Sequence, residues 1–241
     1  MRKSKRILIM AVMLLMTINA NAWPWLSPYA YCFNNPIKFI DPDGRKVVFV
    51  NGYLGFGSPK GGATYWNGSN SSFVKSAQST FNDYKTPYFT DYDYKYIESA
   101  SAVRESLGYK YAKDNYQLLI KDMKPGIDKF NFVSHSMGGS FSEGMMKYMN
   151  EQGWETENAL FLNAWEPTRI NTKVENTRID ATCTNDPVQF LSKPIFGESD
   201  IPFSDEQIRI KSSEPIKYIH RDLIDGNCNE LWKLVNEFLE K

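Results

Sequence analysis

FNFVSHSMGG, residues 130–139, decides the fold of this chain because it joins an apolar strand to a helix through a turn of small residues. The first four residues are mostly apolar, as in a buried strand. Apolar residues then recur at helical spacing, at Phe141, Met145, Tyr148 and Met149. Gly153 is a typical stop signal for that helix. The stretch therefore predicts a strand, a sharp turn and a helix.

The turn carries Ser136 at its centre. A serine at such a strand-to-helix turn has a strained backbone, so the residues two before and two after it must be small. Ser134 and Gly138 meet this requirement, and Gly139 is small as well. Ser134 stands where the strict pattern has glycine. Ser136 is the candidate nucleophile, and the alternative interpretation is that it only caps the helix.

The N-terminus has the pattern of a secretory signal peptide. Basic residues within 2–6 precede an apolar run at 7–18, and Ala-Asn-Ala at 20–22 fits a cleavage site. A helix that crosses a bilayer needs roughly 20 apolar residues, which is more than this run supplies. We therefore expect residues 1–22 to be removed and the protein to be exported through the inner membrane, to the periplasm or beyond.

Charge and cysteine content exclude several classes of protein. The full chain has 28 basic and 28 acidic residues, and the expected cleavage removes four basic ones, so nothing indicates a nucleic-acid partner. Residues 46–241 suit one domain. Three cysteines are too few for a disulfide scaffold, but export allows one pair, and Cys183 with Cys228 is the predicted pair. Buried free thiols are the alternative.

Predicted strands and helices alternate along the rest of the chain. Strands are expected at 47–50, 94–98, 159–162, 178–182 and 215–219, and helices at 73–84, 103–123 and 230–239. Parallel strands need long crossovers and are buried on both faces. The fold class is therefore α/β, with a mainly parallel sheet and helices on both faces.

A serine hydroxyl needs a base to become a nucleophile at neutral pH. The chain has two histidines. His135 is the neighbour of Ser136 and projects in another direction, so by elimination the base is His220. It follows the predicted strand 215–219, at a strand end where open α/β sheets place their sites.

The acid that orients the base should lie between serine and histidine in chain order, just beyond a strand. Asp186 meets both conditions. Asp180 lies within the predicted strand 178–182 and Asp205 in an insertion, so both rank lower. The alternative for Asp186 is a turn residue before Pro187.

The oxyanion of the reaction needs two N–H donors. One is the backbone N–H of Met137, the residue after the nucleophile. The second is expected from Tyr53 or Leu54, in a loop where Gly52 lets the backbone approach closely. A simple surface loop is the alternative. The loop lacks the spacing of a phosphate-binding loop. Two histidines, and cysteines without the close paired spacing of metal ligands, indicate no metal site, and no cofactor is expected.

The elbow, the order of strands and helices, and the chain order Ser136, Asp186, His220 resemble the lipase-like branch of the α/β-hydrolase superfamily over residues 46–241. This resemblance implies a three-layer α/β-hydrolase fold and an ester hydrolase with an acyl-enzyme intermediate. The expected partner is a lipid or other ester substrate, and a membrane surface and a cognate inhibitor stay open as further partners. An amidase, a thioesterase or a non-catalytic binding or immunity-like protein of the same fold are the alternatives.

The segment between Asp186 and His220 is rich in apolar residues, namely Val188, Phe190, Leu191, Ile195, Phe196, Ile201 and Phe203. Our hypothesis is that it covers the serine and lines a pocket for an acyl chain. Ordinary core residues are the alternative.

The segment 23–45 carries a second resemblance. YAYCFNNP at residues 29–36 and DPDG at 41–44 look like the end of the Rhs-repeat-associated core, which precedes variable C-terminal toxin domains in bacterial polymorphic toxins. Arg45 stands where that family usually has leucine, and the shell that encloses the toxin is missing. The resemblance implies a toxin-type hydrolase behind a short Rhs-like stub.

Overall fold

The computed structural model describes residues 44–54, 61–83, 85–94, 100–188 and 200–241. The chain divides into two units, Met1–Asp41 and Pro42–Lys241, and every described residue belongs to the second. The expected signal peptide, the Rhs-like motifs up to residue 43 and Cys32 lie outside the described residues.

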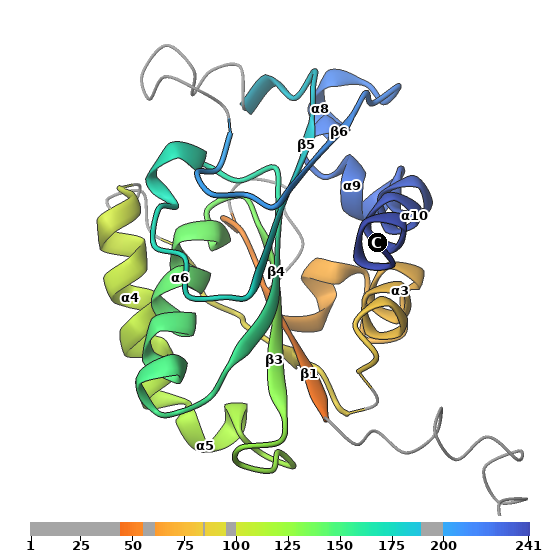
Figure 1. The fold of residues 1–241 in the computed structure, drawn as a ribbon. Coiled ribbons are helices and arrows are strands. Elements are labelled where there is room, and N and C mark those ends of the chain that lie inside the picture. The colour runs from red at the N-terminus through yellow and green to blue at the C-terminus, as the bar shows by residue number, and fades with distance from the viewer. Residues whose placement is uncertain (1–43, 55–60, 84, 95–99, 189–199) are drawn as a thin grey trace, which may run out of the picture. The chain divides into compact units, whose positions relative to one another are not determined.

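Six strands of the described residues form one parallel sheet in the order β2-β1-β3-β4-β5-β6 (Figure 1). Their bounds are β1 Arg45–Val50, β2 Tyr88–Phe89, β3 Lys129–His135, β4 Thr156–Leu162, β5 Thr177–Cys183 and β6 Glu206–Ile210. The predicted parallel sheet is confirmed, and the strands predicted at 47–50, 159–162 and 178–182 correspond to β1, β4 and β5.

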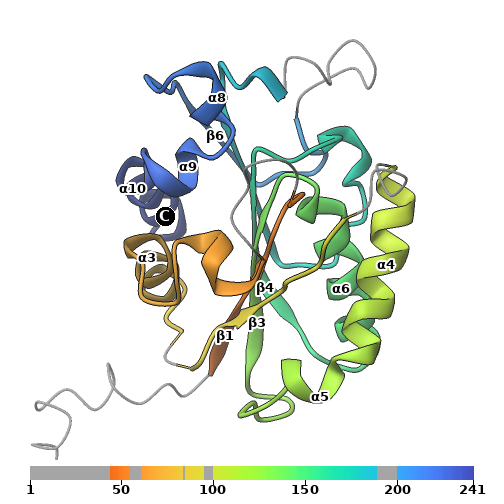
Figure 2. The same cartoon turned by 180° about the vertical axis from the view of Figure 1, so that it is seen from behind.

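Helices cover both faces of this sheet (Figures 1 and 2). One face carries α4 Ser101–Asp114, α5 Tyr116–Leu119 and α6 Gly138–Glu151, and the other carries α3 Ser72–Thr80, α9 Asp222–Asp225 and α10 Cys228–Leu239. Shorter helices are η2 Gly62–Trp66, η4 Pro167–Arg169 and α8 Ile216–Ile219. Within the described residues, no helix has the length and apolarity needed to cross a bilayer. The three-layer α/β architecture is confirmed.

Alternation along the strands builds two separate cores. In β1, Val47 and Phe49 pack toward α3 and α10, whereas Val48 and Val50 pack toward α6. This is the period of two expected for a strand buried on both faces. β3 behaves in the same way, since Phe132 and Val133 belong to opposite cores. The strands are therefore fixed in register by burial on each side.

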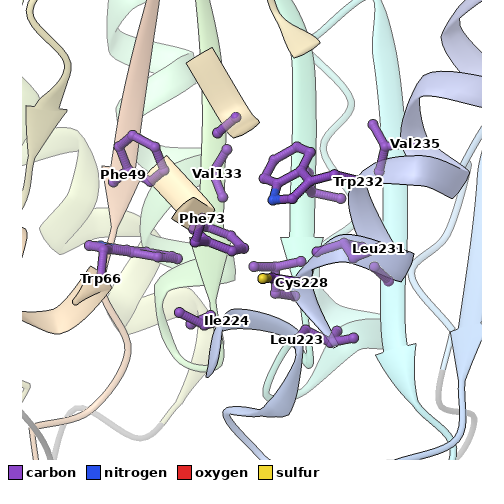
Figure 3. Packing of buried hydrophobic residues seen from close by; sticks show 14 of the residues in the cluster. Phe49, Trp66, Phe73, Val133, Leu223, Ile224, Cys228, Leu231, Trp232 and Val235 are labelled. Carbon is purple, nitrogen blue, oxygen red and sulfur yellow. The ribbon is translucent and has the colours of Figure 1, made fainter. Parts of the chain in front are cut away.

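Aromatic rings connect the elements of the core on the α10 side (Figure 3). The Trp66 ring lies 5.2 Å from that of Phe49 and 5.4 Å from that of Phe73, between ring centroids. Phe73 in turn lies 5.2 Å from Trp232 of α10. Ring pairs of this kind stabilise by about 0.5–1.5 kcal/mol beyond the area they bury. η2 is thereby held against β1, near the end of the strand where the loop after it begins.

The single long helix predicted at 103–123 is wrong in its bounds. It is α4 and α5, which end and begin at Asn115, whose side-chain amide donates to the Tyr111 carbonyl at 2.9 Å. A Cβ on Gly108 would lie 1.9 Å from the Phe141 carbonyl oxygen, and one on Gly144 would lie 1.8 Å from that of Glu105. α4 and α6 thus touch backbone to backbone. The buried face of α4 consists mostly of small residues, which an apolar pattern does not detect.

The second strand of the described residues is β2, Tyr88–Phe89. Of the strand predicted at 94–98, only Tyr94 is described; it lies outside any strand and its hydroxyl donates to the Asn51 carbonyl at 3.0 Å, whereas residues 95–98 lie outside the described residues. The strand predicted at 215–219 is wrong. Residues 216–219 form the helix α8, and the last strand is β6. The sequence pattern does not predict β6, because only Ile208 and Ile210 of this strand are buried. Such partial burial is typical of a strand at the edge of a sheet.

The predicted disulfide is wrong as well. Cys183 at the end of β5 and Cys228 at the start of α10 are both free and buried. Burial raises the pKa of the Cys183 thiol to about 12. The two residues therefore act as small apolar core residues, which was the alternative interpretation.

Candidate active site

The order of the strands places the switch point of the described sheet between β1 and β3. The chain passes from β1 to β2 on one side and then crosses to β3 on the other, so the direction of winding reverses there. In open α/β sheets such a reversal leaves a crevice at the carboxyl ends of the two strands, where ligands bind. Ser136 directly follows β3, and Gly52 is the second residue after β1.

Ser136 has the backbone conformation of a nucleophile elbow. Its φ of 55° lies in the left-handed region, which costs a residue other than glycine about 1–3 kcal/mol. Its N–H donates to the Leu162 carbonyl at 3.0 Å, and its own carbonyl accepts from the Trp165 N–H at 3.1 Å. Bonds from the end of β4 and the loop after it thus hold the strained turn, and the side chain is 7% exposed.

Small residues around Ser136 allow the turn to pass close to its neighbours. A Cβ on Gly138 would lie 2.6 Å from the Asn51 carbonyl oxygen, and one on Gly139 would lie 2.6 Å from a methyl group of Ile170. Ser134 is buried, with its hydroxyl 3.5 Å from the Leu160 carbonyl. A strand, a strained serine turn and a helix at the carboxyl edge of a parallel sheet are the features of an α/β-hydrolase fold, as expected.

Asp186 and His220 meet although they come from different parts of the chain. The Nδ1 atom of His220 lies 2.6 Å from Oδ2 of Asp186. The other carboxylate oxygen of Asp186 accepts the Val188 N–H at 2.9 Å, so the turn after β5 fixes the direction of the carboxylate. An ionised carboxylate only accepts, which means that Nδ1 of His220 carries the proton. The opposite ring atom, Nε2, is then the basic nitrogen, as a general base requires.

His220 lies beside the serine turn, directly after α8 and not at a strand end as expected. Its ring centroid is 4.7 Å from that of His135, the residue before Ser136, and its side chain is 21% exposed. Among the described residues, no hydrogen bond joins the Ser136 hydroxyl to His220. Such bonds are often long in the absence of substrate and shorten when it binds.

The expected oxyanion donors come from the segments after β3 and β1. Met137 precedes α6, and the N-terminus of a helix favours negative charge. In the segment after β1, a Cβ on Gly52 would lie 2.8 Å from Cβ of Ser136, so this loop touches the elbow. Tyr53 and Leu54 follow directly, and the Tyr53 side chain is 41% exposed.

The Asn51 side chain fixes the start of this loop. Its amide donates to the carbonyls of Gly52 and Tyr92, each at 2.8 Å, and its oxygen accepts the Thr90 hydroxyl at 2.7 Å. All of these groups are buried or partly buried, so the loop leaves β1 in a defined direction toward the elbow.

The two acids that ranked lower have other partners. Asp180 accepts from Arg209 at 2.8 Å within the sheet. Asp205 pairs with Lys173 and accepts the Arg178 N–H at 2.7 Å. Neither is bonded to His220 among the described residues.

The apolar segment after Asp186 is described only in part. Ile201 belongs to the core on the α6 side, so for this residue the acyl-pocket expectation is wrong and the core interpretation holds. Phe203 is 68% exposed, and Val188 is partly buried. Phe190, Leu191, Ile195 and Phe196 lie outside the described residues.

Three further residues contact the site and were not singled out from the sequence in this role. The His135 ring lies between the Tyr65 hydroxyl, 2.5 Å from Nδ1, and the His220 carbonyl, 2.7 Å from Nε2. The Asn163 side chain donates to the same carbonyl at 2.9 Å. Only the histidine next to the serine gave a signal in the sequence, since nothing about Tyr65 or Asn163 distinguishes them from core or turn residues.

No protein-family model and no curated protein matches this sequence. Among solved structures, the chain is similar to an esterase/lipase from an uncultured bacterium, with 11% identity and a TM-score of 0.47, over 82% of this chain and 76% of that one. It is also similar to a protein described as a predicted CIB-like hydrolase from Thermoplasma acidophilum, with 13% identity and a TM-score of 0.46, over 83% and 88%. A lipase-esterase related protein from Clostridium acetobutylicum has 9% identity and a TM-score of 0.45, over 80% and 94%. These are similarities of chain path, so what the site can do has to follow from its own residues.

Proposed function

We propose that this protein is a serine hydrolase that cleaves carboxylic esters. The observation that carries the proposal is the 2.6 Å contact between His220 Nδ1 and Asp186 Oδ2, formed beside a serine held at a φ of 55°. An acid and an imidazole in this arrangement are what a serine needs to act as a nucleophile.

The reaction follows from the roles of these groups. The Ser136 hydroxyl attacks the ester carbonyl while His220 Nε2 takes its proton, and Asp186 stabilises the imidazolium that forms. The N–H of Met137, with that of Tyr53 or Leu54, stabilises the oxyanion. The alcohol leaves with the proton from His220, and a water activated by His220 then releases the acid from Ser136.

A lipid ester is the substrate class that we propose, as for a lipase or phospholipase. Two exposed aromatic side chains adjoin the site and support this choice. Tyr53, on the expected oxyanion loop, is 41% exposed, and Tyr218, two residues before His220, is 52% exposed. Exposed aromatics of this kind suit a surface that meets apolar substrate or a membrane interface.

A series of p-nitrophenyl esters from acetate to laurate tests both levels of the proposal. Wild-type protein should hydrolyse them with kcat/KM rising with chain length, and Ser136→Ala should lose the activity. Activity on short esters alone would keep the hydrolase and contradict the lipase. Folded protein without activity on esters, thioesters or amides would favour the non-catalytic alternative.

Export and a toxin-type role are further parts of the proposal. Their support is the signal-peptide pattern at 1–22 and the Rhs-like motifs at 29–36 and 41–44. Expression in bacteria with and without residues 1–22, each with a Ser136→Ala control, tests both. Growth inhibition by the wild-type protein and not by Ser136→Ala would support the toxin role. If the full chain stays in the cytoplasm and residues 1–22 are not removed, export is contradicted.

A further inference from the structure

His135 directly precedes Ser136 in the serine turn and has no part in the steps above. It is buried at the end of β3, so substrate does not reach its side chain. Its ring nevertheless bridges two groups of the site, the Tyr65 hydroxyl and the His220 backbone carbonyl, at 2.5 and 2.7 Å.

The direction of these two hydrogen bonds is determined. Burial, with His220 and Arg221 nearby, holds the pKa of His135 well below its usual range, so the ring is neutral and has one N–H. A carbonyl only accepts, so Nε2 of His135 carries the proton and Nδ1 accepts. Burial also raises the pKa of Tyr65 to about 12, so its hydroxyl keeps its proton and donates to Nδ1.

Asn163 is the second donor to the His220 carbonyl, and it connects that carbonyl to the strand that leads to the acid. Its amide nitrogen donates to His220 at 2.9 Å, and its oxygen accepts the Cys183 N–H at 2.7 Å. Cys183 ends β5, three residues before Asp186. Both lone pairs of the His220 carbonyl are thus used, by donors at the ends of β3 and β4.

His220 needs such a support because no strand carries it. α8 has four residues, and His220 is the residue that follows it. The next residue, Arg221, donates to the Tyr65 carbonyl at 2.7 Å, and its guanidinium lies 4.6 Å from the Tyr65 ring centroid. His135 at the end of β3 therefore holds the His220 backbone directly, and Tyr65 of η2 holds the His135 ring and the side chain of Arg221.

We propose that His135 is a positioning residue for the general base, an inference that rests on the proposed function. Its Nε2–H holds the His220 main chain so that the His220 ring reaches Asp186 with Nδ1 and faces Ser136 with Nε2. The strand that ends in the nucleophile thereby also sets the position of the base. A misplacement of about 1 Å in such a site costs roughly 10²-fold in rate.

Two nearly isosteric variants test this role. His135→Gln keeps an N–H donor for the His220 carbonyl, whereas His135→Met has a side chain of similar size without one. We expect His135→Met to lower kcat by roughly 10- to 100-fold with KM unchanged, because the bond that places the base is lost. His135→Gln should keep most of the wild-type kcat.

A control variant separates positioning from loss of stability. Trp154→Phe removes a buried hydrogen bond, from the indole N–H to the Tyr116 hydroxyl at 3.0 Å, next to the amino end of β4 and away from the site. It should lower the melting temperature and leave kcat unchanged. If His135→Met and His135→Gln lose kcat equally, and the loss follows the fall in melting temperature, the positioning role is overturned.

Nitrogen-15 labelling of histidine gives a readout that does not depend on activity. The chain has two histidines, so both rings are resolved. We expect the His220 Nδ1–H signal to persist in wild type and His135→Gln and to be lost or broadened in His135→Met. An unchanged signal in His135→Met would refute the inference even if wild type is active. If wild type cleaves no ester but the signals change as expected, the proposed function fails and the positioning of His220 stands.

Discussion

At the scale of single residues, Ser136 combines a reactive side chain with an unfavourable backbone conformation. Its φ of 55° is unfavourable for any residue with a Cβ, and hydrogen bonds from Trp165 and to Leu162 hold it there. Strain kept in this way at one residue is compatible with a site whose activity depends on exact presentation of one atom.

Substitution of Ser136 measures this strain. The left-handed region costs a non-glycine residue roughly 1–2 kcal/mol, and the greater freedom of glycine in the unfolded chain offsets roughly 0.5–1 kcal/mol of that. Ser136→Gly should therefore have a free energy of unfolding larger than Ser136→Ala by roughly 0.5–1 kcal/mol, measured by urea denaturation, while both variants are inactive. A Ser136→Ala protein as stable as Ser136→Gly would show that the turn is not strained.

The sequence was informative about residues whose role is local and uninformative about those whose role is tertiary. The elbow follows from small residues around Ser136, and Asp186 follows from chain order. Tyr65 lies far from His135 in the chain, and Asn163 lies far from His220, so each reaches its partner only through the folding of η2 and β4. Their hydrogen bonds leave no spacing or composition signal.

At the scale of elements, β5 carries a buried charge on the face toward α6. Arg178 donates to the carbonyls of Ile170 and Thr172, at 3.0 and 2.8 Å, and forms an ion pair with Glu175. Glu143 of α6 is a second buried carboxyl, 3.6 Å from Arg178. One cation thus faces two carboxyls, and Glu175 is the closer partner.

Glu143 therefore keeps its proton near neutral pH, so that the positive charge of Arg178 is paired with the single negative charge of Glu175. Burial raises its pKa from 4.5 to about 8, against the opposing effects of the Thr172 N–H and Arg178. Between these two pH values the unfolded chain loses the proton and the folded chain keeps it. By linkage, this group makes the free energy of unfolding fall as the pH rises from about 4.5 to 8.

Glu143→Gln should remove this part of the pH dependence. The amide keeps an oxygen for the Thr172 N–H, which donates to Glu143 at 2.8 Å, and it has no proton to lose. The free energy of unfolding of wild type should fall more steeply than that of the variant between pH 5 and 8, and the two should run parallel above that. Urea denaturation at each pH unit measures it. Parallel curves over the whole range would show that Glu143 is ionised in the folded protein.

Elements with an apolar pattern on one or both faces were predictable, and elements with mixed faces were not. β1, β3 and α10 each present apolar residues at the period of their structure. β6 buries two isoleucines between charged residues, and α4 buries glycine, alanine and Arg104. Tertiary contacts with β5 and α6, and not local pattern, define those two elements.

At the scale of the whole molecule, the described sheet brings three distant segments to one edge. Ser136 follows β3, Asp186 follows β5, and His220 follows α8 beyond β6. Because all strands of the described sheet are parallel, their carboxyl ends lie together. The topology therefore explains how the alcohol and the carboxylate come to one edge, and the hydrogen bonds from His135 and Asn163 to the His220 carbonyl bring the imidazole to them.

Labelling with a fluorophosphonate, followed by mass spectrometry of the intact protein and its peptides, tests the central claim most directly. One phosphonyl group should attach to wild type, on the peptide that contains Ser136, and none to Ser136→Ala. In Asp186→Asn, which favours the wrong tautomer of His220, the rate of ester turnover should fall by roughly 10⁴-fold. Equal labelling of wild type and Ser136→Ala, or no labelling of folded wild type, would contradict the assignment of Ser136 as the nucleophile.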